Sequence, residues 1–174
     1  YKRQLLTRLV DSNDREIVSK QIPFSLKAGT GIHLEQDLLI EKPSLWHPYN
    51  PCLYELKTEV RIDDKVVDEV SRKIGIRSIR YTTDDGFLIN GEKLYMRGAN
   101  RHQAFANVGD AASNSMQVRD VIDLKRGGYN AVRAAHYPAD PAFLDACDKY
   151  GLLVVECIPG WQFYNPDSTF IERL

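Results

Sequence analysis

The sequence predicts a multidomain fold of α and β structure, in which an all-β sandwich over residues 1–80 precedes the N-terminal portion of a (β/α)8 TIM barrel over residues 81–174. Two observations predict the two parts. In the first, apolar and polar residues alternate with a period of two, as in half-buried strands. In the second, short apolar runs alternate with segments of helical period, which is the pattern of α/β folds.

The all-β part is clearest at residues 53–62, where apolar residues or threonine alternate strictly with charged residues. Asp63-Asp64 then turns the chain into a second strand at residues 65–74. Further strands are expected at residues 5–10, 16–24 and 32–40. Several short strands separated by proline and glycine are typical of a β-sandwich.

The second part opens with a predicted hairpin. Asn90-Gly91 separates apolar runs at residues 87–89 and 94–96. Asn-Gly is the dipeptide that most readily takes the positive φ angles of a tight hairpin turn. We therefore expect two short antiparallel strands before the barrel begins.

A first amphipathic helix is expected after residue 113. One face of it is formed by Met116, Val118, Val121, Ile122 and Lys125. Ser113 or Ser115 is the predicted N-cap, and Gly127-Gly128 ends the helix. A barrel strand follows at residues 129–134.

A second helix is predicted from Asp140, which caps it, and Pro141, which suits a first helical position. Its apolar face comprises Phe143, Ala146, Cys147 and Tyr150. Gly151 ends the helix, and residues 152–155 form a fully apolar strand of the parallel type. About three barrel strands fit into these residues, whereas a complete barrel takes about 250 residues. We therefore expect this chain to be a piece of a larger enzyme.

Composition excludes several partners. The 23 basic and 24 acidic residues give a net charge of −1, so neither nucleic acid nor an anionic membrane is expected as a partner. No apolar stretch approaches the roughly 18–20 residues that span a bilayer. Cys52, Cys147 and Cys157 form no Cys-x-x-Cys pair, which argues against a disulfide framework and a structural zinc site. The chain begins at Tyr1 with strand-like sequence and no signal peptide.

Polar or aromatic clusters follow the three strand-like runs of the barrel part: Asn100-Arg101-His102, Arg133 with His136, and Glu156 with Trp161. Loops that follow barrel strands converge on one mouth, so we expect these side chains to share a pocket. Structural alternatives stay open for each cluster: the histidines as hydrogen-bonded loop residues, Arg133 as an ordinary salt-bridge partner, Glu156 as a group that only orients its neighbours, and Trp161 as a residue that packs a loop. His102 and His136 have no third ligand at suitable spacing, which argues against a metal site.

Taken in order, these segments resemble glycoside hydrolase family 2, and most closely its β-galactosidase-like bacterial members. Residues 45–54 resemble the Leu-Trp-x-Pro-x-x-Pro-x-Leu-Tyr entry to a strand of that family's immunoglobulin-like domain. Gly75-Ile76-Arg77 resembles the end of the same domain, and residues 87–98 resemble the start of its barrel. Residues 100–103 and 132–138 resemble its first barrel loop and its Arg-x-Ser/Thr-His-Tyr-Pro loop.

The resemblance implies a retaining exo-β-glycosidase of carbohydrate metabolism, foremost a β-galactosidase, with an oligosaccharide or glycoside as its partner and no cofactor. Both catalytic glutamates would lie beyond residue 174, so no catalytic residue is expected in this chain, which alone would be inactive. The implied substrate-binding residues are His102, His136, Arg133, Asn100 and Trp161.

Departures from the family pattern qualify this expectation. Gln103 stands where many galactosidases have glutamate, and Ala135 replaces the usual serine or threonine before His136. The residues after Glu156 lack the family's acidic magnesium ligand, so no metal is expected. The alternatives are a β-glucuronidase of the same family and a non-catalytic carbohydrate-binding β-sandwich. Unpaired sheet edges predict weak stability or association, so a homo-oligomer is possible. The compartment is not predicted: the bacterial cytoplasm and periplasm are both possible.

Overall fold

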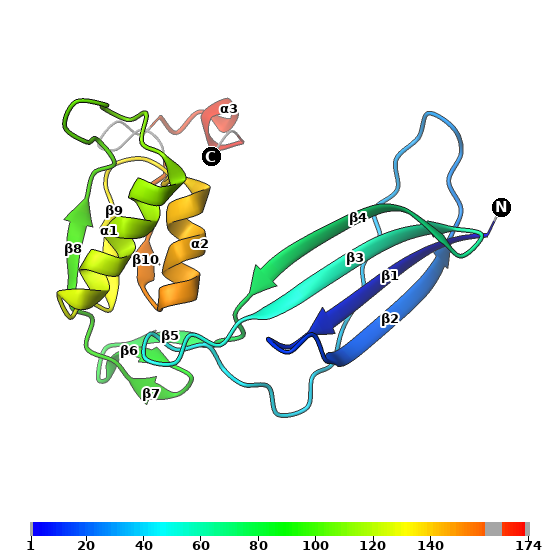
Figure 1. Cartoon of the computed structure of the whole chain (residues 1–174), viewed down its shortest axis with the longest axis horizontal. Helices are drawn as coiled ribbons and strands as arrows, with labels where there is room; N and C mark the ends of the chain where they lie inside the picture. Colours follow the sequence, from blue (N-terminus) through cyan, green and yellow to red (C-terminus); the bar gives the residue numbers. More distant parts are fainter. Residues whose placement is uncertain (1, 159–164, 173–174) are drawn as a thin grey trace. The chain divides into compact units, whose positions relative to one another are not determined.

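The computed structural model describes residues 2–158 and 165–172. The chain forms two compact units (Figure 1). Unit 1 comprises Tyr1–Leu45 and Cys52–Ile76, and unit 2 comprises Trp46–Pro51 and Arg77–Leu174. The six-residue segment Trp46–Pro51 therefore belongs to unit 2, although residues of unit 1 precede and follow it in the sequence.

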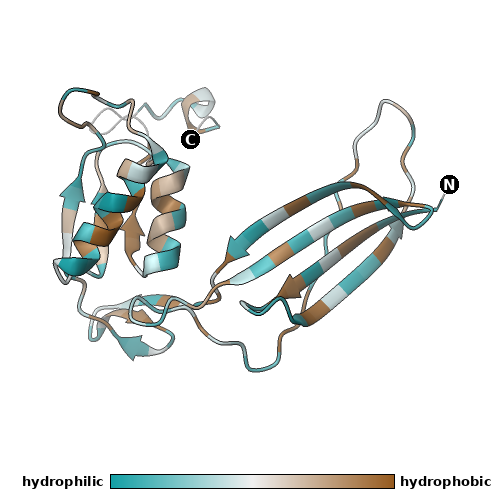
Figure 2. Cartoon of the chain, viewed as in Figure 1, coloured by the Kyte–Doolittle hydropathy of each residue, from teal (hydrophilic) through white to brown (hydrophobic). Residues whose placement is uncertain are grey.

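Unit 1 contains a four-stranded antiparallel sheet. Its strands, which are ordered β2-β1-β3-β4 in the sheet, are β1 (Arg3–Val10), β2 (Glu16–Phe24), β3 (Tyr54–Ile62) and β4 (Lys65–Ile74). Figure 2 shows apolar and polar bands alternating along them; this period predicted β3 most clearly, and the other three strands lie where further strands are expected. The β3–β4 turn has positive φ angles at Asp63 (48°) and Asp64 (65°), as the turn prediction requires.

The strand predicted at residues 32–40 is wrong, because this segment joins no ladder. Its alternation is still visible in burial, since Leu34, Gln36, Leu38 and Ile40 are half-buried and the residues between them are exposed. Gln36 attaches the segment to the sheet through its side chain: Thr7 Oγ1 donates to Gln36 Oε1 (2.5 Å), and Gln36 Nε2 donates to Lys20 O (3.1 Å). The apolar side chains of this segment are therefore partly buried, but its backbone forms no strand pairing with the sheet.

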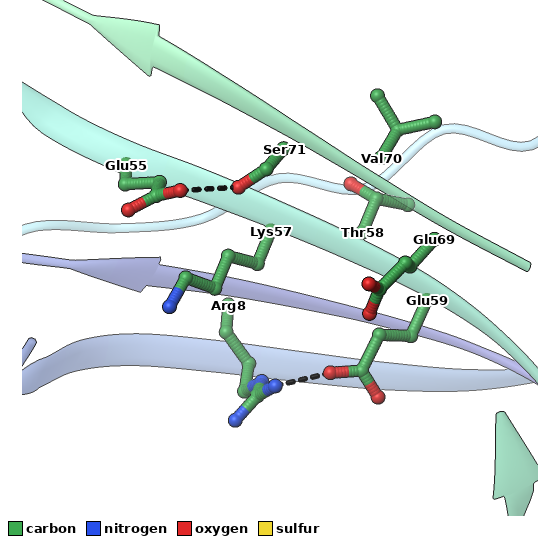
Figure 3. A pocket seen from close by; sticks show the side chains of 8 residues that line it. All are labelled: Arg8, Glu55, Lys57, Thr58, Glu59, Glu69, Val70 and Ser71. Carbon is green, nitrogen blue, oxygen red and sulfur yellow. Dashed lines mark hydrogen bonds and ion pairs between the residues drawn. The ribbon is translucent and has the colours of Figure 1, made fainter.

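The charged face of this sheet contains a buried carboxylate. The Glu59 side chain is only 5% exposed and accepts hydrogen bonds from Arg8 and from Arg61, whose Nη2 lies 2.6 Å from Glu59 Oε2. Figure 3 shows Glu59 and Arg8 among the side chains that line a hollow of about 400 Å³ on this face. Burial alone would raise the pKa of Glu59, but the hydrogen bonds from Arg61 and Arg8 outweigh it and lower that pKa below its ordinary value of 4.5.

The stability of unit 1 should therefore depend on pH through Glu59. Because folding lowers this pKa, the ionised carboxylate stabilises the sheet above pH 4.5, and this contribution is lost as the pH falls through the lowered value. We expect the Tm of the Glu59→Gln variant to fall less steeply than that of the parent as the pH is lowered. The NMR signals of the β1 amides report the unfolding of this sheet. Glu69 in β4 lies opposite Glu59 in β3 and is exposed, so Glu69→Gln is the control. Equal acid declines in the Glu59→Gln variant and the parent would contradict this prediction.

Unit 2 begins with the predicted hairpin. The three-stranded antiparallel sheet comprises β5 (Ile79–Thr82), β6 (Gly86–Ile89) and β7 (Glu92–Lys93). Asn90 and Gly91 have φ angles of 55° and 83°, which confirms the turn. The second arm ends earlier than predicted: Leu94 N still donates to Phe87 O, but residues 94–96 are not a strand.

The rest of unit 2 confirms the predicted strand–helix–strand–helix–strand order. Its elements are β8 (Gly98–Arg101), α1 (Asn114–Arg126), β9 (Ala131–Ala134), α2 (Pro141–Tyr150) and β10 (Leu153–Val155). The three strands are parallel and ordered β10-β9-β8, so strands consecutive in the chain are neighbours, as in a barrel wall. A short helix, α3 (Ser168–Ile171), follows. No helix among the described residues is long and apolar enough to cross a membrane.

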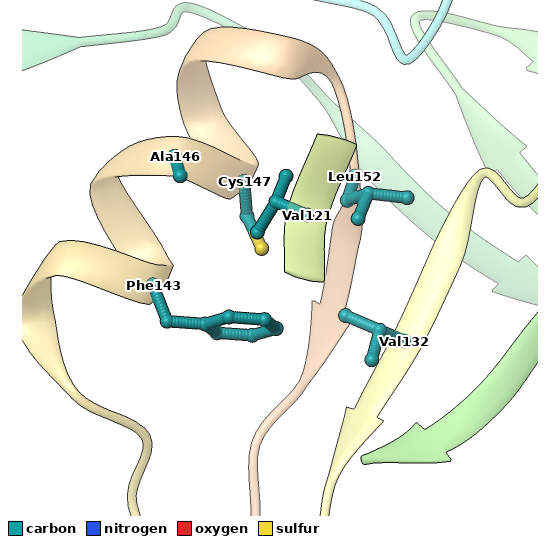
Figure 4. Close-up of a cluster of buried hydrophobic side chains, with 6 residues drawn as sticks. All are labelled: Val121, Val132, Phe143, Ala146, Cys147 and Leu152. Atoms are coloured by element: carbon teal, nitrogen blue, oxygen red, sulfur yellow. The ribbon is translucent and has the colours of Figure 1, made fainter. Parts of the chain in front are cut away.

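The core of unit 2 lies between this sheet and its two helices (Figure 4). It contains Val121, Val132, Phe143, Ala146, Cys147 and Leu152, each at most 3% exposed. Burial raises the pKa of the Cys147 thiol to about 12, so this sulfur packs as a neutral, apolar group. The helices therefore cover one face of the sheet.

Local signals place both ends of α2 where the sequence predicts them. Asp140 accepts a hydrogen bond from Ala142 N (2.8 Å), and Pro141 is the first helical residue. Gly151 ends the helix with φ of 81°. Helix α1 has Ser113 at its N-cap, although the serine oxygen accepts no capping hydrogen bond from the backbone, and Gly127 at its C-cap.

The segment Trp46–Pro51 packs against the end of α2. Trp46 is fully buried, and its Nε1 donates to Asp148 O (2.8 Å). Lys125 Nζ donates both to Pro48 O (3.0 Å) and to Gly151 O (2.9 Å). The backbones of Pro48 and Gly151 are thus held so close that a Cβ on Gly151 would lie 2.3 Å from Pro48 O.

Gly151→Ala should consequently lower the free energy of unfolding by at least about 2 kcal/mol, because a positive φ and a backbone contact both oppose the new Cβ. Gly128 is a matched control, since its φ is 82° but a Cβ there would meet no described atom within 4 Å. Gly128→Ala should cost only the backbone strain, about 1 kcal/mol. Urea unfolding measures both, and equal losses would show that the contact with Pro48 is unimportant.

Candidate functional site

The face of the parallel sheet that the helices do not cover carries one row of side chains in register. Asn100 in β8 pairs with Arg133 in β9, and Arg133 pairs with Val155 in β10. All three residues line a hollow of about 310 Å³. Because side chains alternate across a strand, their neighbours in the chain face the helices instead. The row lies near the C-terminal ends of the strands, where barrel enzymes bind substrates.

Arg133 joins the other predicted residues of the site. Its Nη1 donates to Asn100 Oδ1 (3.4 Å) and lies 3.3 Å from His136 Nδ1. The His136 ring meets the His102 ring edge to face, with centroids 5.2 Å apart and an interplanar angle of 77°. The structure therefore brings Asn100, His102, Arg133 and His136 together, as the spacing of the three loops predicts. The fifth predicted residue, Trp161, lies outside the described residues.

The surroundings of His136 favour the neutral form of its ring. Burial, the Arg133 guanidinium and the neighbouring His102 all lower the pKa of His136 below its ordinary value of 6.5. A guanidinium has only donors, so at this contact Nδ1 of His136 accepts and the ring proton of the neutral form is on Nε2. His136 is thus an oriented, uncharged group in contact with a fixed cation.

The Arg101 side chain lies on the opposite face of β8 from Asn100 and contacts the helices. Its side chain is 8% exposed, and its Nη2 lies 3.1 Å from Asp120 Oδ2. The same guanidinium donates to Gln117 and lies 4.2 Å from the ring centroid of Phe143. These partners belong to α1 and α2, so Arg101 anchors β8 to the helical layer, while the adjacent Asn100 faces the hollow.

Three further hydrogen bonds connect the loops that follow β8, β9 and β10. Gln103 N donates to Tyr137 Oη (3.2 Å), and Gln103 Oε1 accepts from Asp140 N (3.1 Å). Glu156 Oε1 accepts from Ala139 N (2.6 Å). The sequence suggested that Glu156 orients neighbouring groups as one alternative, but nothing in it indicated that Tyr137 bonds to Gln103. The sequence spacing cannot show such side-chain to backbone contacts between loops.

No group of three histidine, cysteine, aspartate or glutamate side chains suited to a metal ion occurs within residues 2–158 and 165–172. The side chains brought together at the site offer hydrogen bonds and a fixed positive charge. A neutral imidazole, an amide and a guanidinium offer oriented donors and acceptors, which is what recognition of hydroxyl groups requires.

Two protein-family models match nearly the whole chain. The model described as glycosyl hydrolases family 2 matches residues 3–77, and the one described as glycosyl hydrolases family 2, TIM barrel domain, matches residues 81–165. Together they confirm the predicted fold class, an immunoglobulin-like β-domain followed by the beginning of a TIM barrel.

Curated proteins and solved structures agree with these matches. The chain is 44% identical to a β-galactosidase of Thermoanaerobacter pseudethanolicus over 76% of its own length and 18% of that protein. It is 35% identical to a β-glucuronidase of Bacteroides fragilis over 95% of its length and 24% of that protein.

Among solved structures, a family 2 glycosyl hydrolase from Bacteroides cellulosilyticus matches with a TM-score of 0.86 and 34% identity, over 91% of this chain and 22% of that one. A β-glucuronidase from Bacteroides uniformis matches with a TM-score of 0.89 and 29% identity, over 98% of this chain and 21% of that one. The chain thus spans about a fifth of the length of these proteins.

Proposed function

The chain belongs to glycoside hydrolase family 2, and from this membership we propose that it carries part of the sugar-binding wall of a retaining exo-β-glycosidase. The preferred substrates are terminal β-linked galactosides. Asn100, His102, Arg133 and His136 are the proposed contacts to the sugar, together with Trp161. The observation that carries the proposal is the contact of Arg133 with both Asn100 and His136, at the mouth end of the parallel sheet.

The chemistry of these side chains supports sugar recognition. A sugar hydroxyl both donates and accepts hydrogen bonds, and a neutral imidazole can do the same with its two nitrogens. Burial and Arg133 lower the pKa of His136, which favours its neutral form. Asn100 offers an amide in the same row. None of these groups can act alone as a nucleophile on a glycosidic bond.

Retaining hydrolysis requires two carboxyl groups about 5–5.5 Å apart, one as acid and base and one as nucleophile. Glu156 is a poor candidate for either, because its carboxylate accepts from the backbone of Ala139. We therefore assign both catalytic glutamates to barrel strands outside residues 1–174. Arg133 would then hold the nucleophilic carboxylate ionised by its fixed charge.

A β-glucuronidase is the second candidate. It is favoured by the match to the Bacteroides fragilis β-glucuronidase, which extends over 95% of this chain. A glucuronide differs from a galactoside in the configuration at C4 and by a carboxylate at C6, and the carboxylate needs a cation or several donors. Arg133 is the cation of the described site, and its Nη1 already contacts Asn100 and His136, so the galactoside remains the first assignment.

A panel of nitrophenyl glycosides tests the proposal on the natural gene product that carries residues 1–174. We expect the highest kcat/KM for the β-galactoside, with the first-formed sugar in the β configuration by proton NMR. A higher value for the β-glucuronide would select the second candidate. Hydrolysis of no glycoside, or formation of the α-anomer first, would overturn the reaction class. Residues 1–174 expressed alone should give no turnover.

A further inference from the structure

The three loops of the site are tied together by hydrogen bonds of side chains that do not line the hollow of Asn100 and Arg133. Gln103 follows His102 directly, and its backbone N–H donates to the hydroxyl of Tyr137, which directly follows His136 (3.2 Å). The residues next to the two histidines are therefore joined to each other. This bond fixes the spacing of the two loops at the point where the imidazoles meet at 5.2 Å.

Two more bonds hold the segment after His136 from either side. Gln103 Oε1 accepts from Asp140 N (3.1 Å), and Glu156 Oε1 accepts from Ala139 N (2.6 Å). The two acceptors come from the loops after β8 and β10, and the two donors are adjacent amides of the loop after β9. A carboxylate that accepts from a backbone N–H makes a charge-assisted bond, which is shorter and stronger than a neutral one.

We propose that Gln103, Tyr137 and Glu156 form a brace whose task is to orient His136 for substrate, so that all three are positioning residues of the glycoside site. The inference rests on the proposed function and deepens it. It assigns a use to Glu156 that needs no contact with sugar. It also explains how glutamine serves at position 103: the residue is required here as a hydrogen-bond acceptor for Asp140 N, for which an amide oxygen suffices.

The brace predicts a distinctive response to substitution in the natural gene product. Gln103→Ala and Glu156→Ala each remove one acceptor, and a lost hydrogen bond of this kind corresponds to about a 3- to 10-fold effect. We expect that effect in KM, because His136 is proposed to bind the sugar, and kcat should change by less than about twofold. Gln103→Glu and Glu156→Gln each retain an acceptor, so the KM of these two variants should stay within about twofold of the parental KM.

A second readout does not depend on activity. Diethyl pyrocarbonate modifies imidazole rings, and mass spectrometry of peptides gives the rate at His136 in each variant. Both alanine variants should increase that rate severalfold, whereas Gln103→Glu and Glu156→Gln should not. Glu92→Ala removes an exposed carboxylate of β7, remote in the fold from the three loops, and should leave KM and the rate at His136 unchanged.

The two readouts separate the possible failures. If the parent protein hydrolyses no glycoside but the alanine variants still increase the modification rate at His136, the proposed function is wrong and the brace is retained. Hydrolysis that continues with unchanged KM in both alanine variants, together with an unchanged rate at His136, overturns the brace. A fall in Tm alone, without either effect, would reduce these residues to a structural role and also overturn it.

Discussion

Replacing Arg133 by alanine is expected to lower kcat/KM of the natural gene product for its best glycoside by about 10²–10³-fold, the range observed when one preorganised electrostatic group is removed from an active site. Arg133 contacts both Asn100 and His136, so its loss removes one contact from each of these two side chains. It also removes the charge that favours an ionised nucleophile, so the loss should appear mainly in kcat. Steady-state kinetics over a range of pH measures this.

Two further variants make the Arg133 result interpretable. Arg133→Lys retains the charge but not the planar fork of donors, so it should recover only part of the activity. Arg126→Ala removes an exposed arginine at the end of α1, 77% exposed and paired only with Asp123 among the described residues, and should leave kcat/KM unchanged. An Arg133→Ala protein with parental kinetics would exclude this residue from the site.

The same variant should alter the titration of the neighbouring imidazole. Arg133 is one of the causes that lower the pKa of His136, after burial, so removing its charge should raise that pKa towards 6.5. Any acid limb of kcat/KM that depends on neutral His136 should then move to higher pH in Arg133→Ala. This direction distinguishes a missing charge from a general loss of structure.

Local sequence signals were sufficient for most elements of the fold. The alternation of residues 54–62 and the Asp140-Pro141 start of α2 each act within a few residues, so they are readable without knowledge of the rest of the chain. The failure at residues 32–40 has a physical cause. Alternation reports which side chains face a partner, whereas a strand also requires a partner backbone at hydrogen-bonding distance. That segment has the first but not the second.

The site was predictable to the extent that strand ends determine it. Parallel strands bring their C-terminal ends to one edge, so the polar residues that end or follow β8 and β9 had to meet. Which side chain of each cluster enters the hollow follows from alternation along a strand: Asn100 enters it and Arg101 does not. The hydrogen bonds of Gln103 and Glu156 to backbone amides depend on loop conformation, which spacing in the sequence does not determine.

Arg101→Met is expected to be the most destabilising substitution, at about 3 kcal/mol, the low end of the range for a broken buried ion pair, because Arg101 is buried but the Asp120 side chain is 23% exposed. Arg101 is 8% exposed, and its loss removes the donor to the buried Gln117 amide oxygen and the nearer cation of the Asp120 carboxylate, which keeps the exposed Arg119 at 3.8 Å. Methionine keeps much of the apolar stem over Phe143, so the loss should come from the charge and the hydrogen bonds. Thermal and urea unfolding measure it.

Arg119 provides a matched comparison, because it lies 3.8 Å from the same Asp120 carboxylate but is 59% exposed. Arg119→Met should therefore cost no more than about 1 kcal/mol. Adding Gln117→Leu to Arg101→Met should restore part of the stability, since a buried amide whose Nε2 already has no partner among the described residues is then replaced by an apolar group. If Arg101→Met and Arg119→Met were equally mild, β8 would not depend on its anchor to the helices, and the loop that carries His102 would owe its position to the brace alone.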